Sequence, residues 1–259
     1  MKVQLSDKNK VKSLAAVFRH VHNLSDVINL QFRDDGLYMQ GMDSSHACLF
    51  ELSLAADWFD HYVLPTPCVL GVYSIILSKV ISCLLEGQTI TLSMDADGDR
   101  LGVELAGEGT VTKVWELPLV DLDSEQLQVP ESEYSADISC RSQMFAKLVS
   151  EMAIFSDSLR FDISEETIAL VASGDQGKMR AEIKEEDINE FCLEEGVTLA
   201  LTLGISYVAG ICAFSKLADD VYIQCSPEAP VKFQYSLDEQ APGESECFMR
   251  FFVAPKIDD

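Results

Sequence analysis

The sequence lacks several features on which whole classes of protein depend. No apolar run among its 259 residues approaches the roughly 20 residues that a membrane-spanning helix needs, so no membrane partner is expected. Lys2 is not followed by the apolar segment of a signal peptide, and none is predicted. The chain also has no Gly-x-x-x-x-Gly-Lys-Ser/Thr loop, which argues against ATP hydrolysis.

Paired cysteines and metal-ligand spacings are missing as well. The 8 cysteines are scattered without a Cys-x-x-Cys pair, which favours reduced, buried thiols over a disulfide framework or a zinc site. The 4 histidines have no ligand spacing, and no carboxylate pair stands at motif spacing with a base or an oxyanion donor. Residues 95–99 are similar to a calcium loop, but glycine is misplaced, so a hairpin turn is expected. We therefore expect no enzyme, no cofactor and no metal.

What the sequence does contain is a repeat at one fixed spacing. An apolar pattern between residues 14 and 39 returns 131 positions later without a gap, and Ser25-Asp26 returns unchanged as Ser156-Asp157. The same offset carries the pattern of 70–92 onto 201–223. One supersecondary unit is therefore used twice. The function should belong to an assembly or a surface rather than to one pocket.

Hydrophobic periodicity gives each half the same order of elements. Apolar stripes at helical spacing predict helices over 8–22, 71–84, 141–154 and 205–216. Strands are expected at 27–33, 36–41, 46–54, 88–94, 100–106, 110–117, 158–163, 167–173, 177–183, 219–225, 230–236 and 247–253. The acidic segments 185–195 and 237–246 are expected to be mobile loops.

These elements predict an α+β fold of two similar domains, each with two helices packed on antiparallel sheet. Residues 119–131 have no steady period and contain several acids and a proline, so they are expected to form an extended connector. The predicted division is an N-terminal domain over 1–117, a connector over 118–134 and a C-terminal domain over 135–259.

Basic residues are scarce and unevenly placed. The chain has 19 Lys and Arg against 43 Asp and Glu, with a net charge of −24, which is unfavourable to nucleic acid overall. The four predicted helices nevertheless sum to +7, which leaves −31 for the rest. Such segregation would attract a polyanion to the helices and repel it elsewhere. A solvated helix face is the alternative for residues 8–22, but it leaves the near-absence of acids on the other helices unexplained.

Three segments in order carry a family resemblance. They are Met42-Asp43-Ser44-Ser45-His46, the connector Leu122-Asp123-Ser124-Glu125-Gln126-Leu127 with Val129-Pro130-Glu131, and the tail Ala254-Pro255-Lys256-Ile257-Asp258. Phe59-Asp60-x-Tyr62 also fits, and the match runs from the first helix to the tail. Together these segments resemble the sliding clamps of the proliferating cell nuclear antigen family.

The resemblance implies a homotrimeric ring, the DNA clamp or processivity fold, whose helices line a hole around double-stranded DNA. Contacts in the hole would go to phosphates and carry no base information, which permits sliding. The cations expected to face DNA are Lys8, Lys10, Lys12, Arg19, Lys79, Arg141, Lys147 and Lys216. The chain would act as a polymerase processivity factor, placed on DNA by a clamp loader, in the nucleus if the source is eukaryotic.

The resemblance also implies a groove for partners and an interface between subunits. In the family, a peptide of DNA polymerases, nucleases and ligases inserts into an apolar pocket under the connector. Matching groove positions are Met42, His46, Ala47, Leu49, Leu127, Val129, Pro130, Pro230, Phe252, Ala254, Pro255 and Ile257. Ring closure pairs edge strands of two neighbours, and the matching interface residues are Val111, Lys113, Trp115, Gly177, Lys178 and Arg180.

The chain departs from the family at several lining positions and at one regulatory loop. Basic positions are replaced by Ser82, Ser150, Ser206 and Ala213, and Ile154 stands where a histidine is common, so DNA binding is expected to be weak and salt-dependent. Glu165-Glu166 stand where eukaryotic clamps carry a lysine for ubiquitin attachment. Two other functions stay open: a subunit of a hetero-trimeric checkpoint clamp, and a peptide-binding scaffold that has lost DNA encirclement.

Overall fold

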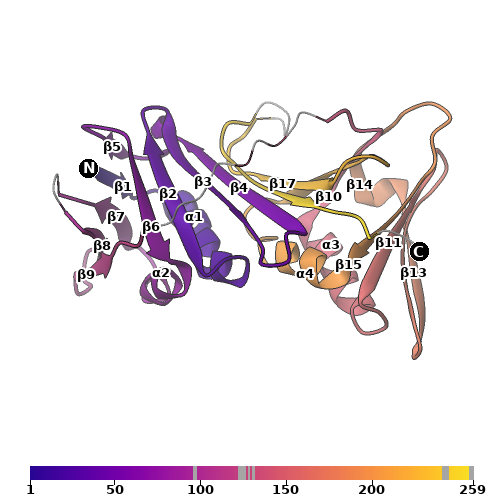
Figure 1. Ribbon diagram of the computed structural model, residues 1–259, viewed down its shortest axis with the longest axis horizontal. Helices are drawn as coiled ribbons and strands as arrows, with labels where there is room; N and C mark the ends of the chain where they lie inside the picture. The colour runs from indigo at the N-terminus through magenta and orange to yellow at the C-terminus, as the bar shows by residue number, and fades with distance from the viewer. Residues whose placement is uncertain (96–97, 122–126, 128, 130–131, 241–244, 257–259) are drawn as a thin grey trace.

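The computed structural model describes residues 1–95, 98–121, 127, 129, 132–240 and 245–256, with Glu185 described by its backbone alone. The chain forms an elongated body of two halves, whose strands meet in the middle (Figure 1). The four labelled helices lie together below the central strands in this view. None of the described helices is long and apolar enough to cross a membrane.

The N-terminal half begins with a strand and a helix, followed by further strands around a second helix. The strands are β1 (Lys2–Leu5), β2 (Val27–Arg33), β3 (Gly36–Met42), β4 (Cys48–Ala55), β5 (His61–Val63), β6 (Cys68–Tyr73), β7 (Thr89–Ser93), β8 (Arg100–Ala106) and β9 (Lys113–Pro118). The helices are α1 (Lys8–His20) and α2 (Ser74–Ile81), with short 3-10 turns η1 (Val21–Asn23) and η2 (Ala56–Trp58).

The C-terminal half repeats this order. Its strands are β10 (Ala136–Arg141), β11 (Ser158–Ile163), β12 (Ile168–Gly174), β13 (Gly177–Ile183), β14 (Ile188–Leu193), β15 (Leu199–Gly204), β16 (Asp220–Cys225), β17 (Val231–Ser236) and β18 (Phe248–Val253). The helices are α3 (Ser142–Met152) and α4 (Ile205–Cys212), with a 3-10 turn η3 (Glu185–Asp187).

Within the described residues the strands form antiparallel sheets of five, nine and four strands. Their orders are β5-β1-β7-β8-β9, then β14-β10-β16-β17-β18-β4-β3-β2-β6, then β13-β12-β11-β15. The nine-stranded sheet joins the two halves through the pairing of β18 with β4. In contrast, β9 and β13 each lie at the free edge of a smaller sheet.

The repeat in the sequence is also present in the hydrogen bonds that start the second helix of each half. The Ser74 N–H donates to the Asp26 carbonyl over 3.0 Å, and the Ile205 N–H donates to the Asp157 carbonyl over 2.9 Å. Both positions shift by the same 131 residues. In each half the two helices pack on one another, α1 on α2 and α3 on α4. The prediction of two similar α+β units is confirmed.

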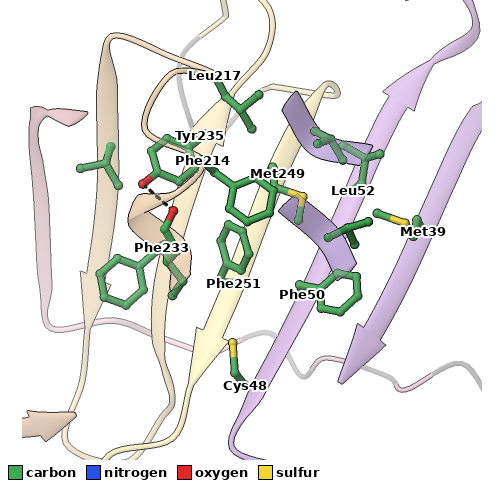
Figure 2. Close-up of a cluster of buried hydrophobic side chains, with 14 of the residues drawn as sticks. Met39, Cys48, Phe50, Leu52, Phe214, Leu217, Phe233, Tyr235, Met249 and Phe251 are labelled. Carbon is green, nitrogen blue, oxygen red and sulfur yellow. Dashed lines mark hydrogen bonds between the residues drawn. The ribbon is translucent and has the colours of Figure 1, made fainter. Parts of the chain in front are cut away.

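A cluster of aromatic side chains fills the junction between the halves (Figure 2). Phe251 of β18 lies opposite Phe50 of β4, and both side chains are fully buried. The rings of Phe214 and Phe251 are 5.1 Å apart, and the Tyr235 hydroxyl donates to the Ile211 carbonyl over 3.2 Å. Aromatic pairs of this kind add to the stabilisation from burial alone. The two halves therefore share one continuous core.

A capping residue fixes the start of α1, and its apolar side fixes how the helix is oriented on the core. Asp7 accepts hydrogen bonds from the backbone N–H groups of Asn9 and Lys10, at 2.9 and 3.0 Å, and so caps α1. These bonds, led by that of Lys10, lower the pKa of Asp7. Leu14 and Phe18 on one side of α1 are buried in the core, which leaves the lysine side of the helix toward solvent.

One predicted loop is in fact regular structure. The acidic segment 185–195, for which the sequence predicts a mobile loop, contains η3 and strand β14, which pairs with β10. Phe191 lies opposite Ile138 in this pairing. The acidic composition is misleading because β14 is an edge strand, where charged residues are common.

Several helix boundaries and short strands also differ from expectation. Residues 71–73 belong to β6, which pairs with β2, so the helix predicted over 71–84 begins at Ser74. The helix predicted over 205–216 ends at Cys212, and the one predicted over 8–22 ends at His20. Strands β1, β5, β6, β10, β14 and β15 are absent from the prediction. They are set by tertiary pairing rather than by local periodicity.

The cysteines are free thiols in the structure. Cys48, Cys140, Cys225 and Cys247 are buried, and burial raises the pKa of Cys140 to about 12, which makes it unreactive. Cys83 and Cys192 depart from the expectation of burial, because both are exposed.

Candidate functional site

Four predicted cations on the helical side are exposed and unpaired. Lys8 and Lys12 lie on α1, Lys79 lies on α2, and Lys216 follows α4. None of them forms an ion pair in the ranges that the structure describes. Unpaired ammonium groups on an otherwise acidic body attract polyanions over a Debye length. These four residues are therefore the strongest candidates for contacts with phosphates.

Cations of the two halves approach each other at the end of α1. Burial lowers the pKa of His20, and the nearby charges of His22, Arg19 and Lys216 lower it further. The ring of His20 also packs edge-on against Phe214, with centroids 5.8 Å apart. Lys216 comes from the C-terminal half, so the positive field of the two halves merges at this junction.

Two other predicted cations are exposed but have acidic partners. The Lys147 Nζ is 3.9 Å from the Glu151 carboxylate, one helical turn away on α3. An Arg141 guanidinium nitrogen is 3.0 Å from the Asp187 carboxylate. Exposed pairs of this kind contribute little to stability and are screened by salt. A phosphate would therefore have to compete with an internal carboxylate at both positions.

Arg19 and Lys10 direct their charge toward the protein backbone. Arg19 is half-buried and donates to the Ile81 carbonyl at the end of α2 over 3.4 Å. The Lys10 Nζ donates to the Trp58 carbonyl over 2.9 Å and lies 5.5 Å from the centroid of the Trp58 ring. The prediction that Lys10 faces DNA has no support from this geometry, because its ammonium group is held by η2.

The residues predicted at the subunit interface lie on the two free sheet edges. Val111 is 75% exposed before β9, and Lys113 donates from Nζ to the Cys83 carbonyl over 3.0 Å. Trp115 lies opposite Val103 and packs partly against the core. Strand β9 is the outer strand of its sheet, so one of its edges is left for another strand to pair with.

The second edge, β13, carries the other predicted interface residues. Gly177 and Lys178 are exposed at its start, and Arg180 reaches the Asp162 and Glu182 carboxylates at 3.3 Å. One exposed apolar residue of these edge strands is missing from the predicted interface: Val114 on β9 is 62% exposed. A single exposed apolar side chain has no signal in hydrophobic periodicity, so sequence patterns could not identify it.

An apolar cavity of about 250 Å³ lies on the nine-stranded sheet. Leu49 and Phe252 alternate along β4 and β18 with core residues Phe50 and Phe251, so the cavity lies on the face away from the core. Nine of the predicted groove residues line it: Met42, His46, Ala47, Leu49, Leu127, Val129, Pro230, Phe252 and Ala254.

The boundary of the cavity differs from the prediction at three places. Ser132 and Tyr134 complete the lining and are absent from the predicted groove. Pro255 is not among the lining residues, because the chain turns away toward β15, where the Lys256 N–H donates to the Thr202 carbonyl over 2.7 Å. Two other predicted groove residues, Pro130 and Ile257, lie outside the described residues.

The loop that forms one end of the cavity is organised by a single carboxylate. Asp43 accepts hydrogen bonds from the N–H groups of Ser45, Ala47 and Cys48 at 2.9, 2.8 and 2.7 Å. Burial alone would raise the pKa of Asp43, but these bonds outweigh it and lower the pKa. His46 is held with φ of 58°, a left-handed conformation. The carboxylate therefore fixes the loop that presents His46 and Ala47 to the cavity.

The other wall of the cavity comes from residues of the predicted connector. The Leu127 N–H donates to the Gln40 side-chain oxygen over 2.9 Å, and the Gln40 side-chain nitrogen donates to the Leu127 carbonyl over 2.8 Å. Farther along, the Lys232 Nζ lies 6.0 Å from the Tyr134 ring centroid and donates to Gln224 over 2.7 Å. Both contacts attach connector residues to the sheet below them.

A larger hollow of about 960 Å³ lies between the start of α1 and the C-terminal half, but its chemistry is different. Its lining is mainly polar and acidic, and includes Asp57, Asp219, Asp220 and Glu239. Within the described residues, no group of three or more histidine, cysteine or acidic side chains is placed to hold a metal ion. The apolar cavity is therefore the better candidate for binding a peptide.

Comparison with known proteins covers almost the whole chain. The family model described as "Proliferating cell nuclear antigen, N-terminal domain" matches residues 4–126. The model described as "Proliferating cell nuclear antigen, C-terminal domain" matches residues 128–256. The junction between the two matches falls inside the predicted connector.

Individual relatives agree with these matches. The chain is 32% identical to "Proliferating cell nuclear antigen" of Saccharomyces cerevisiae over 240 residues, or 90% of each chain. It is 29% identical to the protein of the same name in Chaetomium thermophilum over 252 residues, or 95% of each chain. It is also 24% identical to "DNA polymerase sliding clamp" of Thermococcus gammatolerans over 248 residues, or 96% of each chain.

Proposed function

The chain belongs to the proliferating cell nuclear antigen family of DNA sliding clamps, and we propose that three copies close into a ring that encircles double-stranded DNA. The observation that carries the proposal is the order of strands. From β14 to β6 the nine-stranded sheet joins five strands of one half to four strands of the other. The remaining sheets hold the equivalent five and four strands, ending at β9 and β13. Joining β9 of one copy to β13 of the next would rebuild the same nine-stranded sheet.

The repeat also supplies the position of each residue on these edges. Leu92 of β7 is equivalent to Ile223 of β16, since the two are 131 positions apart. Leu92 pairs with a residue of β8, which in turn pairs with Trp115 of β9. In the same way, Ile223 pairs with a residue of β17, which in turn pairs with Phe251 of β18. Trp115 is therefore the counterpart of Phe251.

The 131-residue offset also relates the strands on the other side of the junction. Gly41 of β3 is equivalent to Ala172 of β12 at the same offset. Gly41 pairs with Phe50, and Ala172 pairs with Met179. Met179 is therefore the counterpart of Phe50.

Combining the two sides gives a register for the proposed joint. Since Phe251 lies opposite Phe50 within the chain, Trp115 of one copy would lie opposite Met179 of the next. One step along, Glu116 would lie opposite Lys178, and both are exposed here. An opposite-charge pair across two strands is favourable, which supports this register. The predicted subunit interface thus acquires a specific pairing.

The proposed ring would hold DNA by topology and by diffuse attraction to phosphates. Lys8, Lys12, Lys79 and Lys216 would supply the attraction from the helical side, without base recognition. No catalytic step is needed, because linking a polymerase to DNA raises its effective concentration at the primer end. The chain would thus act as a processivity factor rather than as an enzyme, in the nucleus if the source is eukaryotic.

The apolar cavity would recruit the partners of the ring. Its lining of methionine, leucine, proline and phenylalanine side chains suits a short plug of apolar residues. Peptides of DNA polymerases, nucleases and ligases are the proposed occupants, and a clamp loader would place the ring on DNA. The division into 1–117, 118–134 and 135–259 is part of the same proposal, since β9 ends at Pro118 and β10 begins at Ala136.

Primer extension with a clamp loader and a DNA polymerase tests encirclement directly. On a circular template the chain should stimulate long products, whereas on a linear template with open ends the stimulation should fall as rings slide off. Blocking the ends with a bound protein should restore it. Equal stimulation on open linear and circular templates would overturn the proposal, as would no stimulation on either.

Light scattering of the purified chain separates this function from a hetero-trimeric clamp. A mass of three chains supports a homotrimer, whereas a monomer that assembles only with other subunits favours the checkpoint clamp. Because α2, α3 and α4 carry few basic residues, the second alternative is a peptide-binding scaffold that no longer encircles DNA. Peptide binding without stimulation of primer extension would favour that scaffold.

A further inference from the structure

The side chain of Gln40 makes a two-point contact with the connector. Its oxygen accepts from the Leu127 N–H over 2.9 Å, and its nitrogen donates to the Leu127 carbonyl over 2.8 Å. The two residues are 87 positions apart in the chain. Leu127 lines the apolar cavity and is 41% exposed, whereas Gln40 does not line the cavity.

Only a primary amide can make this contact from a side chain of this length. Glutamine presents one acceptor and two donors in a plane, so it can pair with both backbone groups of one residue as a neighbouring strand would. A carboxylate has no donor, and a hydrocarbon has neither group. The pairing fixes the height and rotation of the Leu127 backbone above the sheet.

Neighbouring side chains hold the amide in the required orientation. Gln40 on β3 lies opposite Glu51 on β4. The Glu51 carboxylate accepts from the Tyr38 hydroxyl over 2.6 Å and lies 3.5 Å from the Gln40 nitrogen. Because the carboxylate can only accept, it directs the nitrogen of Gln40 to this side and leaves the oxygen for the Leu127 N–H.

We propose that Gln40 is a positioning residue that sets one wall of the peptide groove through its amide contact with Leu127. This inference rests on the proposed peptide-binding function of the cavity. If the wall is already fixed before binding, the entropic cost of ordering it is not subtracted from the binding free energy. Affinity therefore increases without any new contact. Gln40 is half-buried on the face of the sheet away from the core, so its replacement leaves no core cavity.

The test uses Gln40→Met, which keeps the length of the side chain and removes both hydrogen bonds. Gln31→Met is the matched control, because Gln31 lies on neighbouring β2, where its side chain accepts a bond from Arg33 and makes none to the described connector residues. Fluorescence anisotropy would measure the affinity of a labelled clamp-binding peptide from a replicative DNA polymerase. We expect Gln40→Met to weaken binding about tenfold, and Gln31→Met to leave it unchanged.

A second measurement separates positioning from general destabilisation. Amide hydrogen exchange without peptide should be faster at Leu127 in Gln40→Met, while exchange in β3 and β4 and the trimer mass stay as in the wild type. Gln40→Glu keeps the acceptor for the Leu127 N–H but faces the Leu127 carbonyl and Glu51 with a carboxylate, so it should bind peptide no better than Gln40→Met.

The outcomes distinguish this inference from the function on which it rests. If the wild-type chain fails to bind the peptide, the proposed groove and this inference both fail. If the wild type binds and Gln40→Met binds equally well, or if Leu127 exchange is unchanged, the groove stands and the role of Gln40 is overturned. Equal weakening by Gln31→Met would also overturn it.

Discussion

The backbone N–H of Lys256 donates to the carbonyl of Thr202 over 2.7 Å, at the edge of β15. The same bond occurs in the other half, where the Val120 N–H donates to the Gly71 carbonyl over 2.9 Å at the edge of β6. Thr202 and Gly71 are 131 positions apart. The start of the connector and the C-terminal tail thus play the same structural role in the two halves. Each pairs with a sheet edge that would otherwise be unpaired.

The close approach at Gly71 predicts a strong effect of adding one methyl group. A Cβ atom at Gly71 would lie 2.0 Å from the Val120 carbonyl oxygen, which belongs to the backbone and cannot move without lifting the connector. Gly71→Ala should therefore lower the free energy of unfolding by about 1–3 kcal/mol, as measured by chemical denaturation. Gly210→Ala is the control, since among the described residues no atom beyond the adjacent backbone of α4 lies within 4 Å of an added Cβ there, and it should stabilise by about 1 kcal/mol. Equal stability of the two variants would contradict this geometry.

The register derived for the joint between copies predicts a specific cross-link. Opposing residues on antiparallel strands have Cα atoms about 4.5–5.5 Å apart, which suits a disulfide. Glu116→Cys combined with Lys178→Cys should give covalent dimers and trimers on oxidation, visible on a denaturing gel. Glu116→Cys combined with Arg180→Cys is out of register by two residues and should cross-link poorly. The reverse preference would show that the joint forms in another register.

The different environments of the α1 lysines predict different effects on DNA binding. Lys8→Ala combined with Lys12→Ala removes exposed charge and should flatten the dependence of log affinity on log salt by about 0.9 for each phosphate that is no longer neutralised. Lys10→Ala should leave the salt slope unchanged and instead lower stability, because Lys10 is bonded to the Trp58 carbonyl. Binding of the loaded ring to DNA at several salt concentrations measures both slopes. A larger change in slope for Lys10→Ala would mean that Lys10 turns to the DNA.

Lys232 predicts an unusual dependence of stability on pH. Burial, followed by the charge of Arg250, lowers the pKa of Lys232 from its ordinary value of 10.5 to about 8. Below about pH 8 the amine is charged in both states, and the cost of burying the charge is fully present. Between about pH 8 and pH 10.5 the folded state has released the proton of Lys232, whereas the unfolded state has not. The free energy of unfolding therefore rises with pH in this range.

Lys232→Met removes this titration and provides the measurement. Chemical denaturation from pH 8 to 10.5 should show the wild type gaining roughly 1 kcal/mol more than the variant, because solvent screening at this half-buried site reduces the full effect. Lys8→Met controls for the removal of one charge at an exposed position. Parallel curves for the wild type and Lys232→Met would contradict the burial of this amine.

Sequence patterns predict the repeated elements well because their periodicity is strong. The apolar stripe of 8–22 predicts α1 to within its last turn. Strand β14 escapes prediction because its acidic residues suggest a loop, whereas pairing with β10 decides its structure. Short β1 and β5 carry too few residues for any period to be visible, and they are fixed by pairing with one another.

The candidate site is less accessible to sequence reasoning than the fold. The groove residues come from family resemblance, since Met42 and Leu127 share no spacing that local patterns could detect. The bond between Gln40 and Leu127 joins segments far apart in the chain, so only three-dimensional pairing reveals it. The bond from the Lys10 ammonium group to the Trp58 carbonyl also escapes prediction. A count of charges does not show where an ammonium group points.

The aromatic junction between the two halves has a consequence for how a closed annulus could be opened. Phe50, Phe214 and Phe251 make the seam inside each chain a buried part of its core. The equivalent seam between copies would contain Met179, Cys83 and Trp115 at the matching positions, with less aromatic area. A loading machine that separates one pair of strands would therefore part neighbouring chains and leave each chain intact, so that every subunit moves as a single rigid block.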